Sequence, residues 1–349
     1  MRHPNPISAH KLKELLFLGA SLGILCLLLC LSIPLFRSEQ VIGKTGDVLP
    51  TDSEAPEGHL RILLATKDRA AGLSDVLMLL SFDREAGGLS ILQIPRDTYV
   101  NFQSGSYRKI NGAPNSLGGM EEFRAAMERS LGLTIDHYVR LGADAFREGV
   151  DALGGVELTL SEPMDYEDPA GGLSIHLKAG KQTLDGEAAE QFVRYRADYL
   201  RGDLGRLDAQ KLFLAALAEK VLAERSPLRL ARLAAALAKD VETDLSPTEL
   251  FQIAECFTEC SAESILLVTA PGEDVRGRDG GSYYVLSSRG MDELLLRCFG
   301  RKKEGSFDPD GCFLHGENKE FLRVYESYVP YRLYDVGEIA QSAIEIPRT

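Results

Sequence analysis

Short apolar runs recur along the chain from residue 59 and alternate with segments of helical periodicity. Residues 60–64, 76–80 and 89–92 are mostly aliphatic. Runs of this length are typical of strands buried on both faces of a sheet. Residues 120–131 repeat apolar side chains with helical spacing and end at Gly132, which predicts an amphipathic helix.

The same alternation continues toward the C-terminus. Further helices are predicted over residues 143–153, 204–223 and 228–239, and further strands over residues 156–160, 265–268 and 283–286. Another helix begins at Ser246, where Pro247 and Glu249 complete a capping box. Strands that alternate with helices predict a layered α/β protein. Residues after Phe299 are polar and indicate no element.

The segment 15–36 differs from the rest because its 22 residues carry no charge. At about 1.5 Å per residue, a helix of this length crosses the ~30 Å hydrocarbon core of a bilayer. Arg2, Lys11 and Lys13 precede it, and positive charge predicts that this short side stays in the cytoplasm. A cleaved signal peptide is the alternative, but its apolar region is usually only ~7–15 residues. We therefore expect a single-pass type II protein of the cell membrane, with the chain after Phe36 outside the cytoplasm.

The overall charge limits the choice of partner. The chain has 39 Lys and Arg against 52 Asp and Glu, a formal net charge of −13. Sequence-independent binding of nucleic acids depends on neutralising phosphates with Lys and Arg, so we expect no nucleic-acid partner. A phosphate ligand would need a local basic pocket.

Six cysteines are present, two of them inside the segment 15–36. No C-x-x-C pair occurs, so a zinc site or a thioredoxin-like site has no support. In an oxidising compartment Cys298 and Cys312 are the best candidates for a disulfide.

Two aspartates lie at the edges of neighbouring predicted strands. Asp68 follows the strand of residues 62–66, and Asp75 precedes the strand of residues 76–80. One or two carboxylates suit Mg²⁺, which fills its other positions with water and phosphate oxygens. Both aspartates can equally well cap turns, and their spacing does not decide between the two interpretations.

Arginines form the other candidate positions. Pro95 ends the strand of residues 89–93 and places Arg96 at the edge of the sheet, where α/β folds bind ligands. The planar guanidinium suits phosphate, although a structural contact with Asp97 is the alternative. Arg194 and Arg196 stand two residues apart and would share one face of an extended chain. A charged edge strand is the other explanation for this pair.

Arg206 and Gln210 are four residues apart at the start of the helix predicted over residues 204–223. This spacing places them on one helical face, near an N-terminus that attracts anions, although a solvated helix face is the alternative. With the preceding clusters they supply the groups needed to stabilise a pyrophosphate with a metal ion. No G-x-S-x-G nucleophile motif occurs.

In this order the motifs resemble those of the LytR-CpsA-Psr family of cell-wall glycopolymer ligases, over about residues 60–299. The resemblance is carried by IPRDTYV at residues 94–100, KIN at 109–111, DALGGV at 151–156, VRYR at 193–196 and GDLGR at 202–206, followed by Gln210. One departure from the family pattern is Leu73. Many members carry an arginine at this position, directly before the pair that corresponds to Ser74 and Asp75. One phosphate contact would then be absent, or it would be supplied by Lys67 or Arg69.

The resemblance implies an α/β/α sandwich around a mixed central sheet, preceded by one transmembrane helix. It implies an extracytoplasmic, Mg²⁺-dependent phosphotransferase. Its donor would be a polyprenyl-pyrophosphate-linked glycopolymer, such as teichoic acid or capsular polysaccharide. The acceptor would be the C6 hydroxyl of N-acetylmuramic acid in peptidoglycan, with polyprenyl phosphate released. The helix faces of residues 212–221 and 228–237 would line an apolar channel for the lipid tail, although core packing explains them equally well.

The family pattern also assigns roles to residues. It makes Asp68 and Asp75 the Mg²⁺ ligands. The residues that surround the reacting pyrophosphate would be Asp75, Arg96, Arg194, Arg196, Arg206 and Gln210. Substrate binding would involve Asp97, Lys109 and Asp203. A metal-bound Asp75 would be a poor general base.

We therefore expect a cytoplasmic N-terminus at residues 1–14, an anchor at 15–36, a linker at 37–58, a catalytic domain at 59–300 and a tail of unassigned role at 301–349. Two alternatives remain from other classes of protein. A non-catalytic polyprenyl-lipid-binding protein would need the apolar channel but not the metal aspartates. A cell-envelope regulator that acts on transcription would need a cytoplasmic effector, and residues 1–14 leave little room for one.

Overall fold

The computed structural model describes residues 58–341, apart from residues 68–72, 103–107, 169–172, 225 and 304. The predicted anchor at 15–36 and residues 37–57 of the predicted linker therefore lie outside the described residues, as does Asp68. In the part of the chain that is described, no helix is both long enough and apolar enough to cross a membrane.

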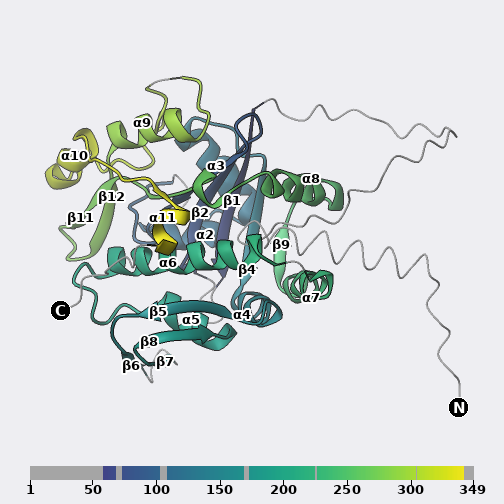
Figure 1. Cartoon of the computed structure of the whole chain (residues 1–349). Helices are drawn as coiled ribbons and strands as arrows, with labels where there is room; N and C mark the ends of the chain where they lie inside the picture. Colours follow the sequence, from purple (N-terminus) through teal and green to yellow (C-terminus); the bar gives the residue numbers. More distant parts are fainter. Residues whose placement is uncertain are drawn as a thin grey trace, which may run out of the picture.

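A mixed sheet of seven strands forms the centre of the described structure (Figure 1). Its strand order is β13 (Tyr334–Asp335), β10 (Ile265–Thr269), β3 (Gly88–Gln93), β2 (Leu77–Asp83), β1 (His59–Lys67), β4 (His137–Gly142) and β9 (Val241–Thr243). β1 runs parallel to β4 and β3 runs parallel to β10, whereas β2 is antiparallel to both of its neighbours. The carboxyl ends of β1, β3, β4 and β10 therefore meet at one edge of the sheet.

The aliphatic runs become central strands because both faces of the sheet are covered. Ile62 and Leu64 of β1 pack into one apolar core, while Leu63 and Ala65 pack into a second core on the opposite face. Each apolar side chain in such a strand is shielded from water by a helix layer on its own face of the sheet, and this burial stabilises the strand. The mixed sheet with helices on both faces confirms the predicted α/β/α arrangement.

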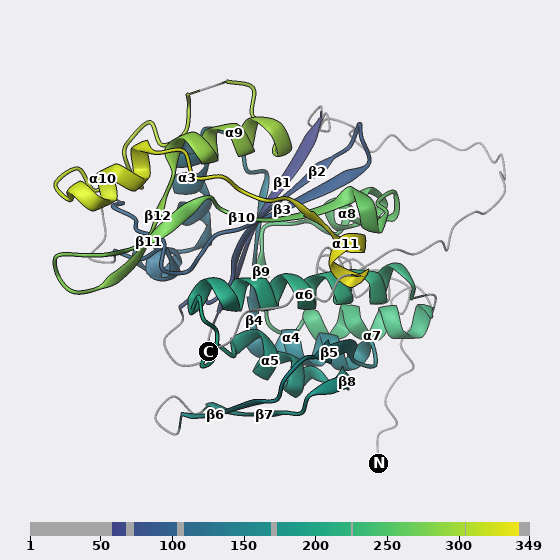
Figure 2. The ribbon, with the colours of Figure 1, turned by 60° about the vertical axis from the view of Figure 1, so that its left-hand side comes forward.

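The two helix layers are shown from the side in Figure 2. One face of the sheet is covered by α2 (Ala113–Ser116), α3 (Met120–Leu131) and α9 (Ser288–Cys298). The other face carries α4 (Ala143–Ala152), α5 (Gly186–Arg194), α6 (Asp203–Leu222), α7 (Pro227–Leu237), α8 (Pro247–Thr258) and α11 (Val336–Gln341). The predicted helix ends are confirmed at two places: Gly132 closes α3 in the left-handed conformation, and Ser246 and Glu249 form the capping box of α8.

Three two-stranded sheets lie outside the central sheet. They pair β5 (Val156–Leu160) with β8 (Gly180–Leu184), β6 (Met164–Asp168) with β7 (Leu173–Leu177), and β11 (Gly272–Arg276) with β12 (Ser282–Leu286). The remaining elements of the described residues are two short 3₁₀ helices, η1 (Ile110–Gly112) and η2 (Ala262–Ser264), and the helix α10 (Lys319–Glu326).

The segment after residue 300, for which the sequence indicated no element, is integrated into the fold. α10 packs against the β11–β12 hairpin, where Phe321 and Val324 join Tyr283 and Val285 in a small apolar cluster. β13 extends the central sheet through two residue pairs with β10. Residues 319–341 are thus part of the folded domain.

The expected disulfide between Cys298 and Cys312 is absent, and both residues are free thiols. Each packs at the margin of the same apolar core. Burial raises the pKa of both thiols, and a protonated thiol is a poor nucleophile for disulfide exchange.

Candidate active site

The candidate residues come from loops at the carboxyl edge of the sheet. Asp75 stands two residues before β2, and Arg96 stands three residues after β3. Asn111 joins the two loops, because its N–H donates to the carbonyl of Arg96 (3.2 Å) and its carbonyl accepts from the N–H of Ser74 (2.9 Å). The KIN segment therefore fixes the spacing between Asp75 and Arg96.

Four charged side chains meet at this edge. Arg96 Nη1 lies 2.7 Å from Asp75 Oδ1, and Arg96 Nε lies 3.4 Å from Asp203 Oδ1. Arg206 Nη2 lies 3.0 Å from Asp203 Oδ1, while its Nη1 lies 3.9 Å from Asp75 Oδ1. We call Asp75, Arg96, Asp203 and Arg206 the charge cluster. The carboxylates of Asp75 and Asp203 each lie near both arginines and so hold the two guanidinium groups close together.

The start of α6 supplies half of the charge cluster. Gly202 precedes the helix with a φ of 52°, a conformation that side chains rarely adopt. A Cβ at Gly205 would lie 2.6 Å from the Cβ of Tyr199, so only glycine lets the first helical turn pack this closely. Asp203 and Arg206, three residues apart, then pair on the first turn. This explains the G-D-L-G-R spacing in physical terms.

Gln210 and the arginines of the RYR segment lie around α6 and α5. Gln210 is buried, and its Nε2 donates to the carbonyl of Val193 (3.1 Å). Arg194 pairs with Glu190 at 3.1 Å, while Arg196 is exposed and makes no ion pair with any described residue. Both arginines act on the charge cluster through space: Arg194 contributes to lowering the pKa of Asp75, after larger effects, and Arg196 contributes to lowering that of Arg206.

The extended conformation considered for residues 193–196 is wrong for the first two of them. Val193 and Arg194 are the last residues of helix α5, and Tyr195 after it is extended. The helix begins at Asp185, whose side chain accepts from the N–H of Ala188, and it buries Phe192 in the core. The helix is stabilised by its N-cap and by burial of its apolar face, and this stabilisation decides the conformation as far as Arg194. The two-residue spacing of the arginines carries no such energy.

Asp97 and Lys109 form a separate pair beside the charge cluster. Lys109 Nζ lies 2.8 Å from Asp97 Oδ1 and 5.6 Å from the centre of the Tyr283 ring. Asp97 follows Arg96 directly in the chain, but the structure pairs it with Lys109. Asp203, predicted to bind substrate, is the counter-ion of Arg96 and Arg206 in this structure.

Electrostatics keep Asp75 and Arg96 ionised. Burial alone would raise the pKa of Asp75, but the charges of Arg206 and Arg96 outweigh it and hold the pKa below its ordinary value. Burial alone would lower the pKa of Arg96, but Asp203 and Asp75 hold it above its ordinary value. Asp75 is therefore a carboxylate at neutral pH, suited to hold a cation and weak as a base.

Several buried polar atoms at this edge lack a hydrogen-bond partner among the described residues. They are Ser74 Oγ, Arg206 Nε and Gln210 Oε1. Most buried polar groups in folded proteins are hydrogen-bonded, so a group of unpaired atoms beside the charge cluster indicates a place for a polar ligand. Ser74 has a fully buried side chain, and the sequence analysis gave it no role.

Within the described residues, the carboxylate of Asp75 is the one candidate site residue that fits the role of a Mg²⁺ ligand. Asp75 Oδ1 faces the arginines, while its Oδ2 forms no hydrogen bond or ion pair with a described residue. No group of three or more His, Cys, Asp or Glu side chains that could hold a metal occurs among the described residues. Mg²⁺ commonly uses only one or two carboxylates and completes its shell with water and phosphate oxygens. Asp75 can serve in this way.

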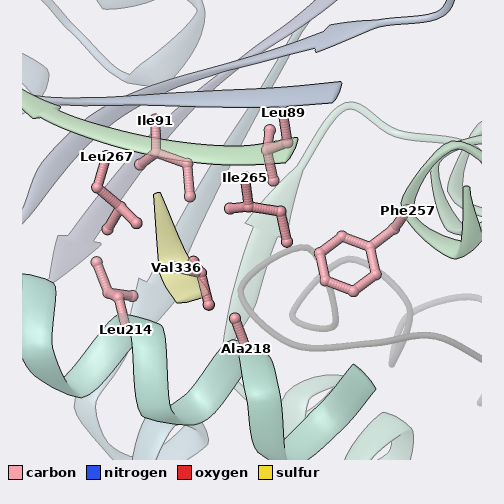
Figure 3. Close-up of a pocket in the computed structure, with 8 residues that line it drawn as sticks. All are labelled: Leu89, Ile91, Leu214, Ala218, Phe257, Ile265, Leu267 and Val336. Carbon is pink, nitrogen blue, oxygen red and sulfur yellow. The ribbon is translucent and has the colours of Figure 1, made fainter. Parts of the chain in front are cut away.

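An apolar cavity lies between the sheet and α6 (Figure 3). Its walls come from β3, β10, α6, α8 and α11, through Leu89, Ile91, Leu214, Ala218, Phe257, Ile265, Leu267 and Val336. Its volume of about 10 Å³ holds one water-sized molecule. The helix face of residues 212–221 contributes to it as expected, whereas α7 contributes no residue to this cavity and packs against α4.

The fold and the charge cluster define a class of protein: an α/β/α protein with a cluster of paired arginines and aspartates at the carboxyl edge of its sheet. The chain belongs to the LytR_cpsA_psr family, whose family model matches residues 37–298. The resemblance noted from the motifs is thereby confirmed.

Curated relatives include two enzymes that carry transferase names. The chain is 30% identical over 226 residues to polyisoprenyl-teichoic acid–peptidoglycan teichoic acid transferase TagV of Bacillus subtilis, covering 63% of this chain and 57% of that protein. It is 28% identical over 244 residues to the corresponding transferase TagU of Oceanobacillus iheyensis, covering 68% of this chain and 73% of that protein. The chain thus spans little more than half the length of TagV.

Solved structures agree with the fold. The crystal structure of B. subtilis TagV superposes with a TM-score of 0.59 at 26% identity, covering 71% of this chain and 98% of that chain. Protein gbs0355 of Streptococcus agalactiae superposes with a TM-score of 0.62 at 21% identity, covering 71% and 90%. The second match supports the fold alone.

Proposed function

We propose that this protein is a phosphotransferase that moves a polyprenyl-pyrophosphate-linked glycopolymer onto peptidoglycan. The observation that carries this proposal is the charge cluster, in which Arg96 and Arg206 converge on Asp75 beside unpaired buried polar atoms. The named relatives TagV and TagU, which are teichoic acid transferases of the same family, support the class of reaction.

The two arginines would bind the pyrophosphate of the donor. Arg96 and Arg206 present guanidinium groups that suit phosphate oxygens, and Asp203 and Asp75 hold them in place before substrate arrives. Arg194 and Arg196 add positive charge at the end of α5. Pre-organised donors of this kind stabilise charge that develops as the phosphoryl group is transferred.

Asp75, with Asp68 seven residues before it in the chain, would hold Mg²⁺. When bound, the ion would neutralise charge on the phosphoryl oxygens of the donor. The protein itself would orient the acceptor, the C6 hydroxyl of N-acetylmuramic acid, for in-line attack, with polyprenyl phosphate as the leaving group. The lowered pKa of Asp75 favours the role of ligand over that of base.

The lipid tail would lie in the apolar cavity between the sheet and α6. This cavity starts one turn of α6 beyond Gln210, at Leu214, and continues to Ala218. Because it is small in this structure, α11 and Val336 would have to shift outward to admit an isoprenoid chain. The apolar segment at residues 15–36 would anchor the protein in the cell membrane, with the catalytic domain outside the cytoplasm.

The test uses the full chain in detergent micelles with a polyprenyl-pyrophosphate-linked glycan, peptidoglycan fragments and Mg²⁺. We expect release of polyprenyl phosphate that EDTA abolishes and Mg²⁺ restores. Asp75→Ala should abolish release, while Asp310→Ala, at an exposed aspartate outside the charge cluster, should leave it unchanged. Lipid binding without release, with or without EDTA, would contradict the enzyme and support a lipid-binding protein.

A further inference from the structure

A second cavity, of about 290 Å³, lies at the tip of the β11–β12 hairpin. Its walls include Tyr99, Arg108, Arg278, Tyr283, His315 and Glu317. We call it the hairpin cavity. Its volume approaches the ~300 Å³ at which small-molecule sites begin, which is room for a sugar residue. Nothing in the proposed phosphoryl transfer uses these side chains.

The hairpin cavity adjoins the charge cluster along one segment of chain. The residues after Arg96 pair with β12, because the N–H of Tyr284 donates to the carbonyl of Asp97 (2.9 Å) and the N–H of Tyr99 donates to the carbonyl of Tyr284 (2.8 Å). Lys109, which pairs with Asp97, also lies over the ring of Tyr283. A ligand in the hairpin cavity would therefore be separated from Arg96 by the Asp97–Lys109 pair.

The floor of the hairpin cavity is a rigid aromatic cluster. The ring of Tyr99 stacks on His315 at 5.1 Å and meets Phe321 and Tyr283 edge-on at 5.2 and 5.8 Å. Phe321, Tyr99 and Tyr283 are almost fully buried, so they hold the cluster in shape without a ligand. His315 is only partly buried and lines the cavity, so it is the member of the cluster that can offer a ring to a ligand at small cost in conformational entropy.

The rim carries both donors and acceptors. Arg278 and Glu317 are exposed, and neither forms an ion pair with a described residue. Asp279 is already used, because its carboxylate accepts from the Tyr283 hydroxyl at 2.6 Å and from the N–H of Gly281 at 3.0 Å. The guanidinium of Arg278 can donate hydrogen bonds and the carboxylate of Glu317 can accept them. Together they suit a ligand that has both hydrogen-bond donors and acceptors. Sugar hydroxyl and acetamido groups have this property, whereas a simple phosphate only accepts.

One wall of the hairpin cavity belongs to the part of the chain that the family model does not match. That match ends at residue 298, while His315, Glu317 and Phe321 lie beyond it and enter the cavity next to α10. The hairpin cavity is therefore built partly from residues outside that match.

We propose that the hairpin cavity is a saccharide subsite that holds one sugar residue of the glycan next to the reacting pyrophosphate. The inference rests on the proposed function, which brings two glycans to the charge cluster. The sugar would pack against His315, with Arg278 donating to it and Glu317 accepting from it. The acceptor peptidoglycan and the donor polymer share this chemistry.

The test is direct titration by calorimetry, using the full chain in detergent micelles without Mg²⁺ or lipid. The probes are a peptide-free N-acetylglucosaminyl–N-acetylmuramic acid disaccharide, an N-acetylglucosamine disaccharide without the lactyl group, and a peptidoglycan stem peptide alone. We expect the first or both disaccharides to bind and the peptide not to bind. Preference for the first assigns the subsite to the acceptor, and equal binding assigns it to a sugar of either glycan.

Variants locate the bound sugar. Arg278→Ala and Glu317→Ala should each weaken disaccharide binding about tenfold, the value expected for one charge-assisted hydrogen bond of roughly 1.4 kcal/mol. Arg276→Ala, at an exposed arginine of the same hairpin outside the cavity, should bind normally. Unchanged affinity in the first two variants, or binding of the peptide alone, would overturn the saccharide subsite.

The outcome is independent of catalysis. Asp75→Ala should bind the disaccharide as well as the natural chain does, because Asp75 is not among the residues that line the hairpin cavity. Normal transfer without disaccharide binding would overturn the subsite and leave the phosphotransferase standing. Disaccharide binding without any transfer would overturn the phosphotransferase and leave the saccharide subsite standing.

Discussion

The guanidinium of Arg96 lies 2.7 Å from the carboxylate of Asp75, across two loops that are 21 residues apart in sequence. The same oxygen of Asp75 lies 3.9 Å from Arg206 on α6. The carboxylate therefore holds two arginines from different elements toward one point before any substrate is present. Pre-organisation of this kind lowers the reorganisation needed when a pyrophosphate binds.

Arg96 should be essential for transfer but not for folding. Removing one pre-organised donor typically lowers kcat by ~10²–10³, so Arg96→Ala should fall in this range while the far-ultraviolet circular dichroism stays unchanged. Arg96→Lys keeps the charge but loses the planar fork and should recover only part of the rate. Release of polyprenyl phosphate measures both variants. A loss of less than about threefold for Arg96→Ala would eliminate its role in the reaction.

The ionised form of Asp75 should stabilise the fold above acidic pH. The folded-state pKa lies below the ordinary value of 3.8 because the pull of Arg206 and Arg96 exceeds the effect of burial. This contribution is complete above 3.8 and is lost as the pH falls through the lower folded-state pKa. The difference in unfolding free energy between the natural chain and Asp75→Asn should shrink as urea titrations move from pH 6 to about pH 3. A difference that stays constant would show that Asp75 is not coupled to the two arginines.

Asp203 should be needed to keep Arg206 buried. The Arg206 side chain is only 3% exposed, and Asp203 lies 3.0 Å from its Nη2. Breaking a buried ion pair by removing one partner costs roughly 3–5 kcal/mol, and we expect Asp203→Ala to fall near the lower limit because Asp75 remains close to Arg206. Adding Arg206→Met should restore much of the unfolding free energy measured in urea. A cost below about 1 kcal/mol for Asp203→Ala would indicate an ion pair of surface strength.

Elements that depend on local pattern were predictable from the sequence. The aliphatic runs became β1, β2 and β3, and the helix over residues 204–223 is α6 with its boundaries shifted by one residue. Gly202 and Gly205 mark the start of α6 for reasons of backbone conformation and close packing. The loop after Pro95 likewise reaches the edge of the sheet where Arg96 was expected.

Features that depend on distant contacts were not predictable. The two-residue strand β13 has no hydrophobic run of its own and forms only because β10 presents a free edge. Arg194 and Arg196 suggested an extended chain, since their spacing is visible locally, whereas the burial of Phe192 against α6 is not. The pairing of Asp203 with Arg96 joins segments more than 100 residues apart, so no local pattern contains it.

The apolar cavity beside α6 offers a test of where the lipid tail binds. Ala218 is a small, buried residue that lines the cavity, and phenylalanine at this position would fill the remaining volume. Overpacking of this kind typically costs about 1–3 kcal/mol of stability, which thermal unfolding would register. If the tail occupies the cavity, Ala218→Phe should raise KM for the lipid-linked donor by about tenfold with little change in kcat, because the charge cluster is untouched.

Ala223→Phe is the matched control, because Ala223 caps the same helix at an exposed position. It adds the same side chain to α6 without entering the cavity, and its KM should equal that of the natural chain. A soluble donor analogue with a short isoprenoid tail should also bind Ala218→Phe normally, since it does not reach that depth. An unchanged KM for the long-tailed donor in a folded Ala218→Phe variant would place the lipid elsewhere and leave Leu214, Ala218 and Val336 as core residues only.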